Sequence, residues 1–367
     1  MICMATIHDV VKYIEQKKIY ILCLIYCLFY HVYSQDKWIV VTTIQHPTPQ
    51  LKKISRIPGW RMVVVGDKKT PLDWHLENCE YLSPEKQLSL GYKISSMLPW
   101  NHYSRKNIGY LYAIQHGASI IYETDDDNEP LFDLHYLDNI QQNLLLLASE
   151  EPCINVYHYF GLHHVWPRGY PLEKIICSHV YDQTTVVTKE IGVEQGLVNG
   201  DPDVDAIYRL TQYTGEITFP RSGSCVLSMA NYCPFNSQNT FIHKKAFFTL
   251  YLPSTVTMRV SDIWRSYYAQ KLMKLCGLYL AFSGPNAFQD RNNHNYMHDY
   301  IQEQDLYYKS MDLVNFIHAW QSPKNSNTLQ NMHDLISDLV KKEFLGPDEI
   351  SMCDAWLEDL MTVGYLQ

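Results

Sequence analysis

Several features that mark familiar classes of protein are missing from this sequence. The 367 residues carry a formal net charge of −9 and contain no tract of lysine and arginine, which argues against nucleic acid as a partner. None of the ten cysteines forms a Cys-x-x-Cys pair, so a structural zinc site is not expected. The basic, glycine-rich signature of a nucleoside-triphosphate site is also absent, which disfavours a nucleotidyltransferase.

Two further features are absent. The chain has no Asn-x-Ser/Thr glycosylation acceptor, which neither supports nor excludes the secretory pathway. It also has no internal repeat and no low-complexity segment. The composition that is present, 46% hydrophobic and 19% charged residues, is typical of a globular protein with one large core or two smaller ones.

The amino-terminal region is predicted to lie outside the fold. Residues 1–18 form an amino-terminal tail, and Lys17 and Lys18 precede an apolar, aromatic-rich run at 19–33. This run is shorter than the roughly 20 residues that span a bilayer comfortably, so it fits a short signal-anchor or the core of a signal peptide cleaved near Ser34. A buried helix is the less favoured alternative, because the next strand pattern begins only at Trp38.

The first half of the chain alternates strand and helix signals. Apolar, β-branched runs predict four strands, and intervening segments with helical spacing predict two helices. Alternation of this kind predicts an α/β fold with a doubly wound sheet. The strands are expected at 38–44, 61–65, 81–82 and 119–124, and the helices at 51–57 and 103–116.

The second half is richer in loops. We expect a strand at 152–159, an acidic loop at 196–205, mixed strand and loop at 222–232, and a helix at 262–275. After about residue 300 the pattern becomes helical, at 300–320 and 328–363. Residues 301–367 are therefore predicted to form an accessory helical region that follows the main domain.

The most informative stretch is an acidic triplet that directly follows an apolar strand. Asp125, Asp126 and Asp127 come after the run at 119–124, and adjacent carboxylates repel each other unless a cation or solvent offsets the charge. Because successive side chains of an extended segment point in opposite directions, Asp125 and Asp127 are expected on one side of the chain and Asp126 on the other. Carboxylate oxygens suit Mg²⁺ or Mn²⁺, and ligands of open α/β sheets bind at this edge. A solvated acidic loop is the alternative.

Six longer motifs stand in a fixed order along the chain: Val63–Pro71, Arg105–Ile114, Tyr122–Asn128, Gly196–Ala206, Asn236–Thr240 and Ser261–Arg265. In this order they resemble the STELLO-type glycosyltransferase family and, more distantly, the reversibly glycosylated polypeptides. The resemblance covers roughly residues 37–300 and implies a GT-A-like nucleotide-sugar-binding fold, a doubly wound mixed sheet with a C-terminal helical extension. It also implies a single-pass type II Golgi membrane protein, with secretion after signal cleavage as the alternative.

The same resemblance implies roles for individual residues. Asp125 and Asp127 would be the metal-binding pair, with Asp125 reaching the ribose or the metal through water. Thr42 and Asp67, at the ends of the first two strands, would hold the base and ribose, although a plain turn explains Asp67 equally well. Arg105 would grip a phosphate, with an exposed helix-start arginine as the alternative.

Two candidates lie in the second half. An acid at the start of a helix contacts the acceptor or acts as the base in such enzymes, which makes Asp262 the candidate catalytic residue, although it can also be an N-cap. Such enzymes often use a histidine near the end of the domain as a metal ligand, and His294 is the candidate for it. The alternative for His294 is a structural role. The acidic loop with Asp201, Asp203 and Asp205 is expected to border the active site, with a surface loop nearly as favoured.

These features together predict a metal-dependent glycosyltransferase of the secretory pathway. It would use Mn²⁺ or Mg²⁺ and a nucleotide-diphosphate sugar, most simply a UDP-sugar, and would act on a glycan, lipid or protein acceptor. The alternative function is a non-catalytic scaffold on the same fold that organises other Golgi membrane enzymes, because a fold does not fix a function.

Overall fold

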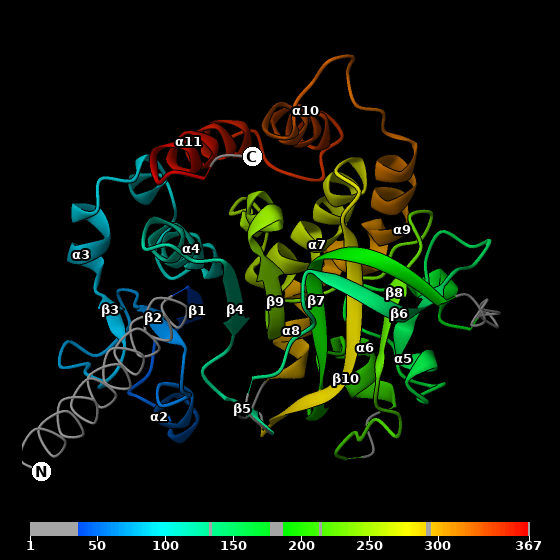
Figure 1. The fold of residues 1–367 in the computed structure, drawn as a ribbon, viewed down its shortest axis with the longest axis horizontal. Helices are drawn as coiled ribbons and strands as arrows, with labels where there is room; N and C mark the ends of the chain where they lie inside the picture. The colour runs from blue at the N-terminus through cyan, green and yellow to red at the C-terminus, as the bar shows by residue number, and fades with distance from the viewer. Residues whose placement is uncertain (1–35, 132–133, 177–185, 213–214, 291–294, 366–367) are drawn as a thin grey trace, which may run out of the picture.

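The computed structural model describes residues 36–131, 134–176, 186–212, 215–290 and 295–365 (Figure 1). The predicted apolar segment 19–33 and the candidate ligand His294 lie outside these ranges. Within them, no helix combines the length and the hydropathy that a membrane crossing requires.

The strands match the apolar runs of the sequence. β1, β2, β3 and β4 lie where the sequence predicts strands, and the other strands of the described residues follow from residue 128 onward. The strands are β1 Lys37–Thr42, β2 Arg61–Val65, β3 Glu80–Leu82, β4 Ile120–Thr124, β5 Asn128–Pro130, β6 Ile140–Leu147, β7 Val186–Gly200, β8 Ser224–Leu227, β9 Asn239–His243 and β10 Tyr279–Gln289.

Helices cover the sheet and form the carboxy-terminal part. The α-helices are α2 Pro49–Ile54, α3 Pro84–Ser89, α4 Lys106–Gln115, α5 Val156–Tyr159, α6 Ala206–Thr211, α7 Met258–Leu275, α8 Tyr296–Gln302, α9 Gln304–Ala319, α10 Thr328–Lys341 and α11 Glu349–Thr362. Short 3₁₀ turns are η1 Lys93–Ser96, η2 Tyr103–Arg105, η3 Leu172–Lys174 and η4 Lys244–Leu250.

All ten strands belong to one mixed sheet in the order β3-β2-β1-β4-β9-β7-β6-β8-β10-β5, with β7 also paired to β10. β3, β2, β1 and β4 are mutually parallel, β9 is antiparallel to both β4 and β7, and β10 is parallel to β7. The carboxyl ends of β1, β2, β4, β7 and β10 therefore lie at the same edge of the sheet. The predicted α/β fold with a doubly wound mixed sheet is confirmed.

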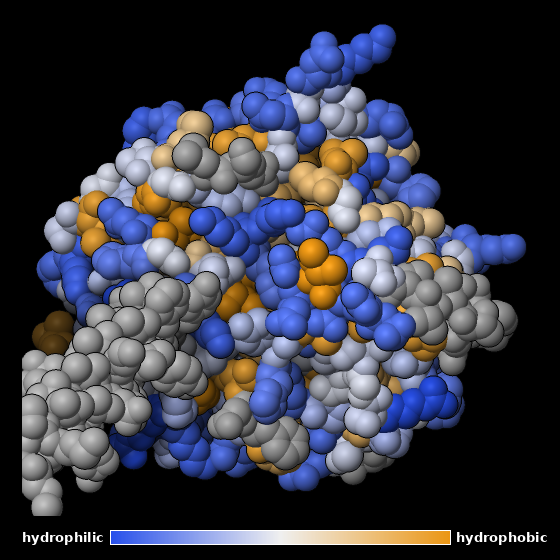
Figure 2. All heavy atoms as spheres, viewed as in Figure 1, coloured by the Kyte–Doolittle hydropathy of each residue, from blue (hydrophilic) through white to orange (hydrophobic). Residues whose placement is uncertain are grey.

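Both faces of the sheet are buried, which explains the uninterrupted apolar runs. Trp38 and Val40 of β1 belong to a large core shared with α4 and α7, whereas the alternating Ile39 and Val41 belong to a second core closed by α2. On the outer surface, hydrophobic and hydrophilic residues are interspersed over the face shown in Figure 2.

Helix α4 packs unusually closely on the sheet because of one glycine. A Cβ atom on Gly109 would lie 2.7 Å from Cγ1 of Val40 and 2.7 Å from Cγ2 of Val65, closer than real contacts allow. The predicted end of this helix is confirmed, since Gly117 follows it with φ +86°, a conformation that glycine adopts without strain. The close packing fixes η2 and the start of α4 beside the end of β4.

A buried ion pair joins β4 to α7. Arg265 Nη2 donates to Glu123 Oε1 at 2.6 Å, Tyr110 donates to the other oxygen of Glu123, and all three side chains are buried. Losing one partner of such a pair leaves an uncompensated buried charge, so the pair fixes the strand and the helix relative to each other. These two elements carry Asp125 and Asp262.

The carboxy-terminal helices hold two loops of the main sheet domain. Asp359 on α11 accepts hydrogen bonds from the backbone N–H groups of Lys93 and Ile94, both at 2.9 Å. Glu349, at the start of α11, accepts from the backbone of Ser254 and Thr255. Figure 1 shows α10 and α11 side by side above α4 and α7. The division at residue 300 stays a prediction, while residues on both sides of it contribute to the same apolar core.

Three local predictions are wrong. Residues 156–159 form the short helix α5 rather than a strand, because the Asn155 side chain accepts from the N–H of Tyr157 and caps a turn. The predicted loop at 196–205 begins only after Gly200, since β7 continues through the apolar pair Leu197 and Val198. Helix α7 begins at Met258, four residues before the predicted start.

Candidate functional site

A pocket of about 520 Å³ opens at the edge where β1, β2, β4, β7 and β10 end. Ligands of open α/β sheets bind at this edge. We call one side the amino-terminal wall, which comprises residues 42–45, 65–69 and 101–105, and the other the carboxy-terminal wall, which comprises residues 168, 203, 238, 258–262 and 289. Asp125, Asp126 and Asp127 lie between them as the acidic turn.

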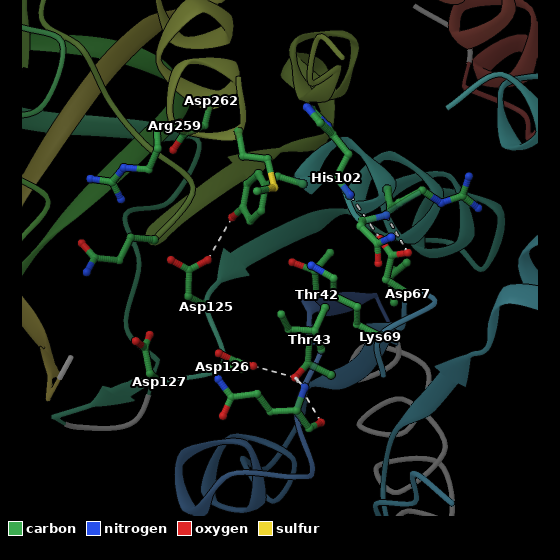
Figure 3. A pocket seen from close by; sticks show the side chains of 18 of the residues that line it. Thr42, Thr43, Asp67, Lys69, His102, Asp125, Asp126, Asp127, Arg259 and Asp262 are labelled. Carbon is green, nitrogen blue, oxygen red and sulfur yellow. Dashed lines mark hydrogen bonds between the residues drawn. The ribbon is translucent and has the colours of Figure 1, made fainter. Parts of the chain in front are cut away.

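The acidic turn presents its three carboxylates differently (Figure 3). Asp126 turns toward the amino-terminal wall, where its Oδ2 accepts a hydrogen bond from Thr43 Oγ1 at 2.6 Å. Asp125 and Asp127 point to the other side, and Asp127 Oδ1 accepts from Gln289 Nε2 at 2.9 Å. The alternation expected from an extended segment is therefore present, and Asp126 has a structural partner.

Asp125 lies over a buried network. Tyr103 Oη donates to Asp125 Oδ1 at 2.9 Å, and Lys106 Nζ lies 3.8 Å from the same oxygen. Lys106 is completely buried and donates to Tyr103 Oη and to the backbone oxygens of Thr124 and Ser237. Burial raises the pKa of Asp125 to about 7, Lys106 acts in the opposite direction, and the neighbouring carboxylates raise it further.

The amino-terminal wall is held by hydrogen bonds to the backbone. Asp67 Oδ1 accepts from the N–H of Asn101 at 2.8 Å, and Oδ2 accepts from the N–H of His102 at 3.3 Å. Thr70 Oγ1 accepts from the N–H of Asp67 and donates to the carbonyl of Thr43. Asp67 therefore does more than close a turn, because its carboxylate joins the end of β2 to the loop before η2.

Arg105 lines the pocket, but its guanidinium donates hydrogen bonds to protein groups. Its Nε and Nη2 donate to Gln87 Oε1 at 3.0 and 2.6 Å, and its Nη1 donates to the carbonyls of Ser95 and Leu98. The guanidinium also lies over the ring of Trp100. Since the side chain is 1% exposed, the alternative of an exposed arginine is wrong. These bonds favour a structural role over the predicted contact with phosphate.

The carboxy-terminal wall is built around a buried ion cluster. Arg168 donates from Nε and Nη2 to both oxygens of Asp203, at 2.7 and 2.8 Å, and from Nη1 and Nη2 to both oxygens of Asp262, at 3.1 and 2.9 Å. Burial opposes the charge on Arg168, but the two carboxylates outweigh it and raise its pKa well above the usual value. Arg168 therefore joins Asp203 and Asp262, which come from separate segments, in one ion cluster.

Asp262 lies in this wall but does not cap its helix. Helix α7 begins at Met258 with Thr257 as its N-cap residue, which places Asp262 in the second turn. Besides Arg168, its Oδ2 accepts from the backbone N–H and the hydroxyl of Ser237, both at 3.3 Å. The N-cap alternative is wrong, and the catalytic role of Asp262 stays a prediction.

The three acids that follow β7 are buried, so the surface-loop alternative is also wrong. Asp201 pairs with Arg209, and Asp205 accepts from the N–H of Tyr208 as the N-cap of α6. Only Asp203 among them lines the pocket. The predicted active-site loop therefore contributes one carboxylate to the site and two structural acids.

The residues of the acidic turn fit a divalent cation that shares its coordination with a ligand. Within the described ranges, no group of three or more His, Cys, Asp or Glu side chains could hold a metal ion. Mg²⁺ is usually held by one or two carboxylates, with water and substrate phosphates completing the octahedron, and Mn²⁺ accepts similar oxygen ligands. Asp125 and Asp127 match this donor set, and the closeness of their like charges favours a cation.

The sequence did not single out four residues of the site: Tyr103, Lys106, Arg168 and Ser237. A signal existed for two of them. Lys106 stands just before the mostly apolar helical run at 108–114, and Arg168 stands between Pro167 and Gly169 in an aromatic-rich loop. Tyr103 and Ser237 carry no such signal, because their residue types are common in loops.

The predicted resemblance to the STELLO-type family is confirmed. Residues 259–367 match the family described as STELLO glycosyltransferases. The chain is 35% identical over 356 residues to two Arabidopsis thaliana proteins named Probable glycosyltransferase STELLO1 and Probable glycosyltransferase STELLO2, and the alignments cover 92% of this chain and 46% of each relative. The chain thus spans about half the length of these relatives, and the resemblance extends beyond residue 300, contrary to the predicted limit.

Among solved structures, the chain is similar to glucosyl-3-phosphoglycerate synthase from Mycobacterium tuberculosis in complex with phosphoglyceric acid. That match has a TM-score of 0.34 and 9% identity, and it covers 78% of this chain and 81% of that chain. A second match, described as a mycobacterial protein, has a TM-score of 0.36 and 9% identity, with 80% and 78% coverage.

Proposed function

We propose that this chain, which resembles the STELLO glycosyltransferases, transfers a sugar from a nucleotide-diphosphate sugar to an acceptor with the help of a divalent cation. The observation that carries the proposal is the pair Asp125 and Asp127, which lie at the end of β4 within a pocket of about 520 Å³. The carboxyl ends of five parallel strands meet there, which is where α/β sheets bind nucleotides.

The acidic turn and the amino-terminal wall are assigned to the donor. Asp125 and Asp127 hold Mn²⁺ or Mg²⁺, which supplies Lewis-acid neutralisation of the diphosphate leaving group when it is bound. Thr42 and Asp67 contact the base and ribose, and the resemblance favours UDP. Although Asp67 already accepts backbone N–H groups, a carboxylate offers about four lone-pair positions, so a ribose hydroxyl can still donate to it.

The carboxy-terminal wall is assigned to the sugar and the acceptor. Asp262 receives a hydroxyl group there and is the candidate base, with Arg168 as its positioning partner. His294 remains the proposed third metal ligand. The acceptor is a glycan, a lipid or a protein.

The proposed location is the Golgi membrane, as a single-pass type II protein anchored through residues 19–33. Secretion after cleavage near Ser34 is the alternative. Extraction of cell membranes with alkaline carbonate separates the two, because an anchored chain stays in the membrane pellet and a cleaved chain is released.

The central experiment measures binding of nucleotide sugars to the full chain by calorimetry, with and without Mn²⁺. We expect Mn²⁺-dependent binding that Asp127→Asn weakens at least tenfold, because one anionic ligand is lost. The matched control is Asp126→Asn, which changes the neighbouring carboxylate that faces Thr43 and should retain binding. If the unmodified chain bound no nucleotide or nucleotide sugar with Mn²⁺, the donor site would be rejected.

One observation favours the non-catalytic scaffold as a second candidate. Both oxygens of Asp262 accept hydrogen bonds from Arg168, which leaves fewer lone pairs for the proton that a base must take. The two functions differ in cells that lack the protein. Asp127→Asn should fail to restore the missing function if turnover is required, and should restore it if the chain acts only as a scaffold.

A further inference from the structure

We infer that the donor sugar is uncharged, a neutral hexose or pentose rather than a sugar with a carboxylate group. The inference rests on the proposed function and narrows it to a substrate class. It follows from the charges of the carboxy-terminal wall, which is the part of the pocket that the sugar would occupy.

The position of the sugar follows from the order of the pocket. If the base and ribose contact Thr42 and Asp67 and the diphosphate lies at the acidic turn, the sugar extends to the opposite side. Figure 3 shows Thr42 and Asp67 on one side of the pocket and Arg259 and Asp262 on the other, and in the sheet order β4, which leads into the acidic turn, lies between β1 and β10. The sugar would therefore face the carboxy-terminal wall, including Asp203, Asp262 and Gln289.

The guanidinium of Arg168 is fully engaged by the protein. A guanidinium has five N–H donors. Those of Arg168 have five contacts, two with Asp203, two with Asp262 and one with the carbonyl of Arg259. A carboxylate on the sugar could bind Arg168 only by breaking a bond to one of these acids.

The second guanidinium of this wall is matched by its own acid. Arg259 Nε donates to Glu303 Oε1 at 2.8 Å, Nη2 donates to the same oxygen, and Glu303 is completely buried. Arg168 and Arg259 thus stand against the wall carboxylates Asp203 and Asp262 and against Glu303, which is buried behind the wall. Together these five groups carry an excess of one negative charge, while the cation proposed at the acidic turn offsets Asp125 and Asp127.

These groups suit hydroxyl donors and repel an anion. Asp262 Oδ1 accepts one hydrogen bond from Arg168 among the described residues, and it can also accept a sugar hydroxyl because each carboxylate oxygen has two lone pairs. The Gln289 amide, which bonds Asp127 and Gln238, adds uncharged polar atoms. A sugar carboxylate would instead face Asp203 and Asp262 at short range, where unit charges of the same sign repel strongly.

The experiment compares UDP-sugars that differ only at C6, using the full chain, Mn²⁺ and calorimetry. UDP-glucose is paired with UDP-glucuronate, UDP-galactose is paired with UDP-galacturonate, and UDP alone is the reference. We expect at least one neutral member to bind roughly tenfold or more tightly than its uronate. A uronate that bound as tightly as its neutral partner, or more tightly, would overturn the inference while leaving the donor site intact. If UDP and all four UDP-sugars failed to bind, the proposed function itself would be rejected.

Two variants identify the groups responsible. Asp203→Asn removes the excess negative charge and should narrow the difference between neutral sugar and uronate, with retained UDP binding as the evidence of a folded pocket. Arg259→Gln removes a positive charge and should leave the preference for the neutral sugar unchanged or stronger. If Arg259→Gln abolished a uronate preference of the unmodified chain, Arg259 would be a carboxylate clamp and the inference would be wrong.

Discussion

The two walls of the pocket are held together by different kinds of interaction. In the amino-terminal wall, the Asp67 carboxylate accepts backbone N–H groups of the next loop, and Thr70 bonds the chain at Thr43. In the carboxy-terminal wall, one buried arginine holds two carboxylates that come from separate segments of the chain. The first wall depends on the backbone, and the second depends on side-chain charges that compensate one another.

This difference predicts a difference in tolerance to substitution. A backbone-supported wall loses one hydrogen bond when a side chain changes, which typically costs about 1 kcal/mol of stability. A wall built on buried charges leaves uncompensated ions when one partner is removed, which typically costs about 3–5 kcal/mol. The four predictions below test this contrast, beginning with the largest expected effect.

Removal of the central arginine should be the most damaging change. Arg168→Met leaves Asp203 and Asp262 buried without their cation, so the free energy of unfolding should fall by about 3–5 kcal/mol. Denaturant titration measures this loss. Arg168→Lys keeps the positive charge but not the forked geometry of the guanidinium, so its free energy of unfolding should lie between those of the unmodified chain and Arg168→Met. Adding Asp203→Asn and Asp262→Asn to Arg168→Met should recover part of the stability, and a loss below about 1 kcal/mol in the single variant would contradict the contrast.

The acid that caps α6 in the same region should give stability a pH dependence. Burial raises the pKa of Asp205 to about 7, while hydrogen bonds from Tyr208 and Trp166 act in the opposite direction. Because the folded pKa exceeds the unfolded one, the contribution of Asp205 is fully present below about pH 4 and is lost as the pH rises through about 7.

The Asp205→Asn variant tests this assignment. It cannot ionise, so its free energy of unfolding should fall less than that of the unmodified chain between pH 4 and 8, by an amount of order a few kcal/mol. Denaturant titrations across this range provide the measurement. If the free energy of unfolding fell equally in the two proteins, Asp205 would not be the cause of the pH dependence.

In the amino-terminal wall, Asp67→Asn should have a smaller effect on stability. The amide oxygen can still accept one of the backbone N–H groups, so the expected loss is about 1–2 kcal/mol, while nucleotide binding should weaken because the anionic ribose partner is gone. Denaturant titration and calorimetry with UDP and Mn²⁺ separate the two effects. A loss as large as that of Arg168→Met would show that the two walls do not differ.

The smallest effect is expected at the boundary between the walls. Tyr103→Phe removes the hydroxyl that donates to Asp125 and contacts Ser237, and it should cost about 1 kcal/mol of stability. Mn²⁺ affinity should fall by about tenfold, a change expected when a group that orients a metal ligand is lost. Calorimetry with Mn²⁺ checks this. Unchanged affinity would mean that Tyr103 does not orient Asp125.

The two walls also differ in how much of their structure could be predicted from the sequence. Strands β1, β2 and β4 were predicted correctly because both of their faces are buried, and buried strands are continuous apolar runs. Thr42, Asp67 and the acidic turn follow these strands directly, so their place at one edge could be anticipated. Helix α5 was predicted as a strand, because its four residues Val-Tyr-His-Tyr favour strands and only the Asn155 cap makes them helical.

The carboxy-terminal wall could not be anticipated in the same way. Arg168 and Asp262 are 94 residues apart, and no local pattern pairs an arginine with one acid among the 39 in the chain. The sequence by itself determined strands β1, β2 and β4, the acidic turn and the alternation of its side chains, because these depend on apolar runs and on neighbours along the chain. Only the tertiary structure decided which charges compensate one another, because that depends on which distant segments the sheet brings together at its edge.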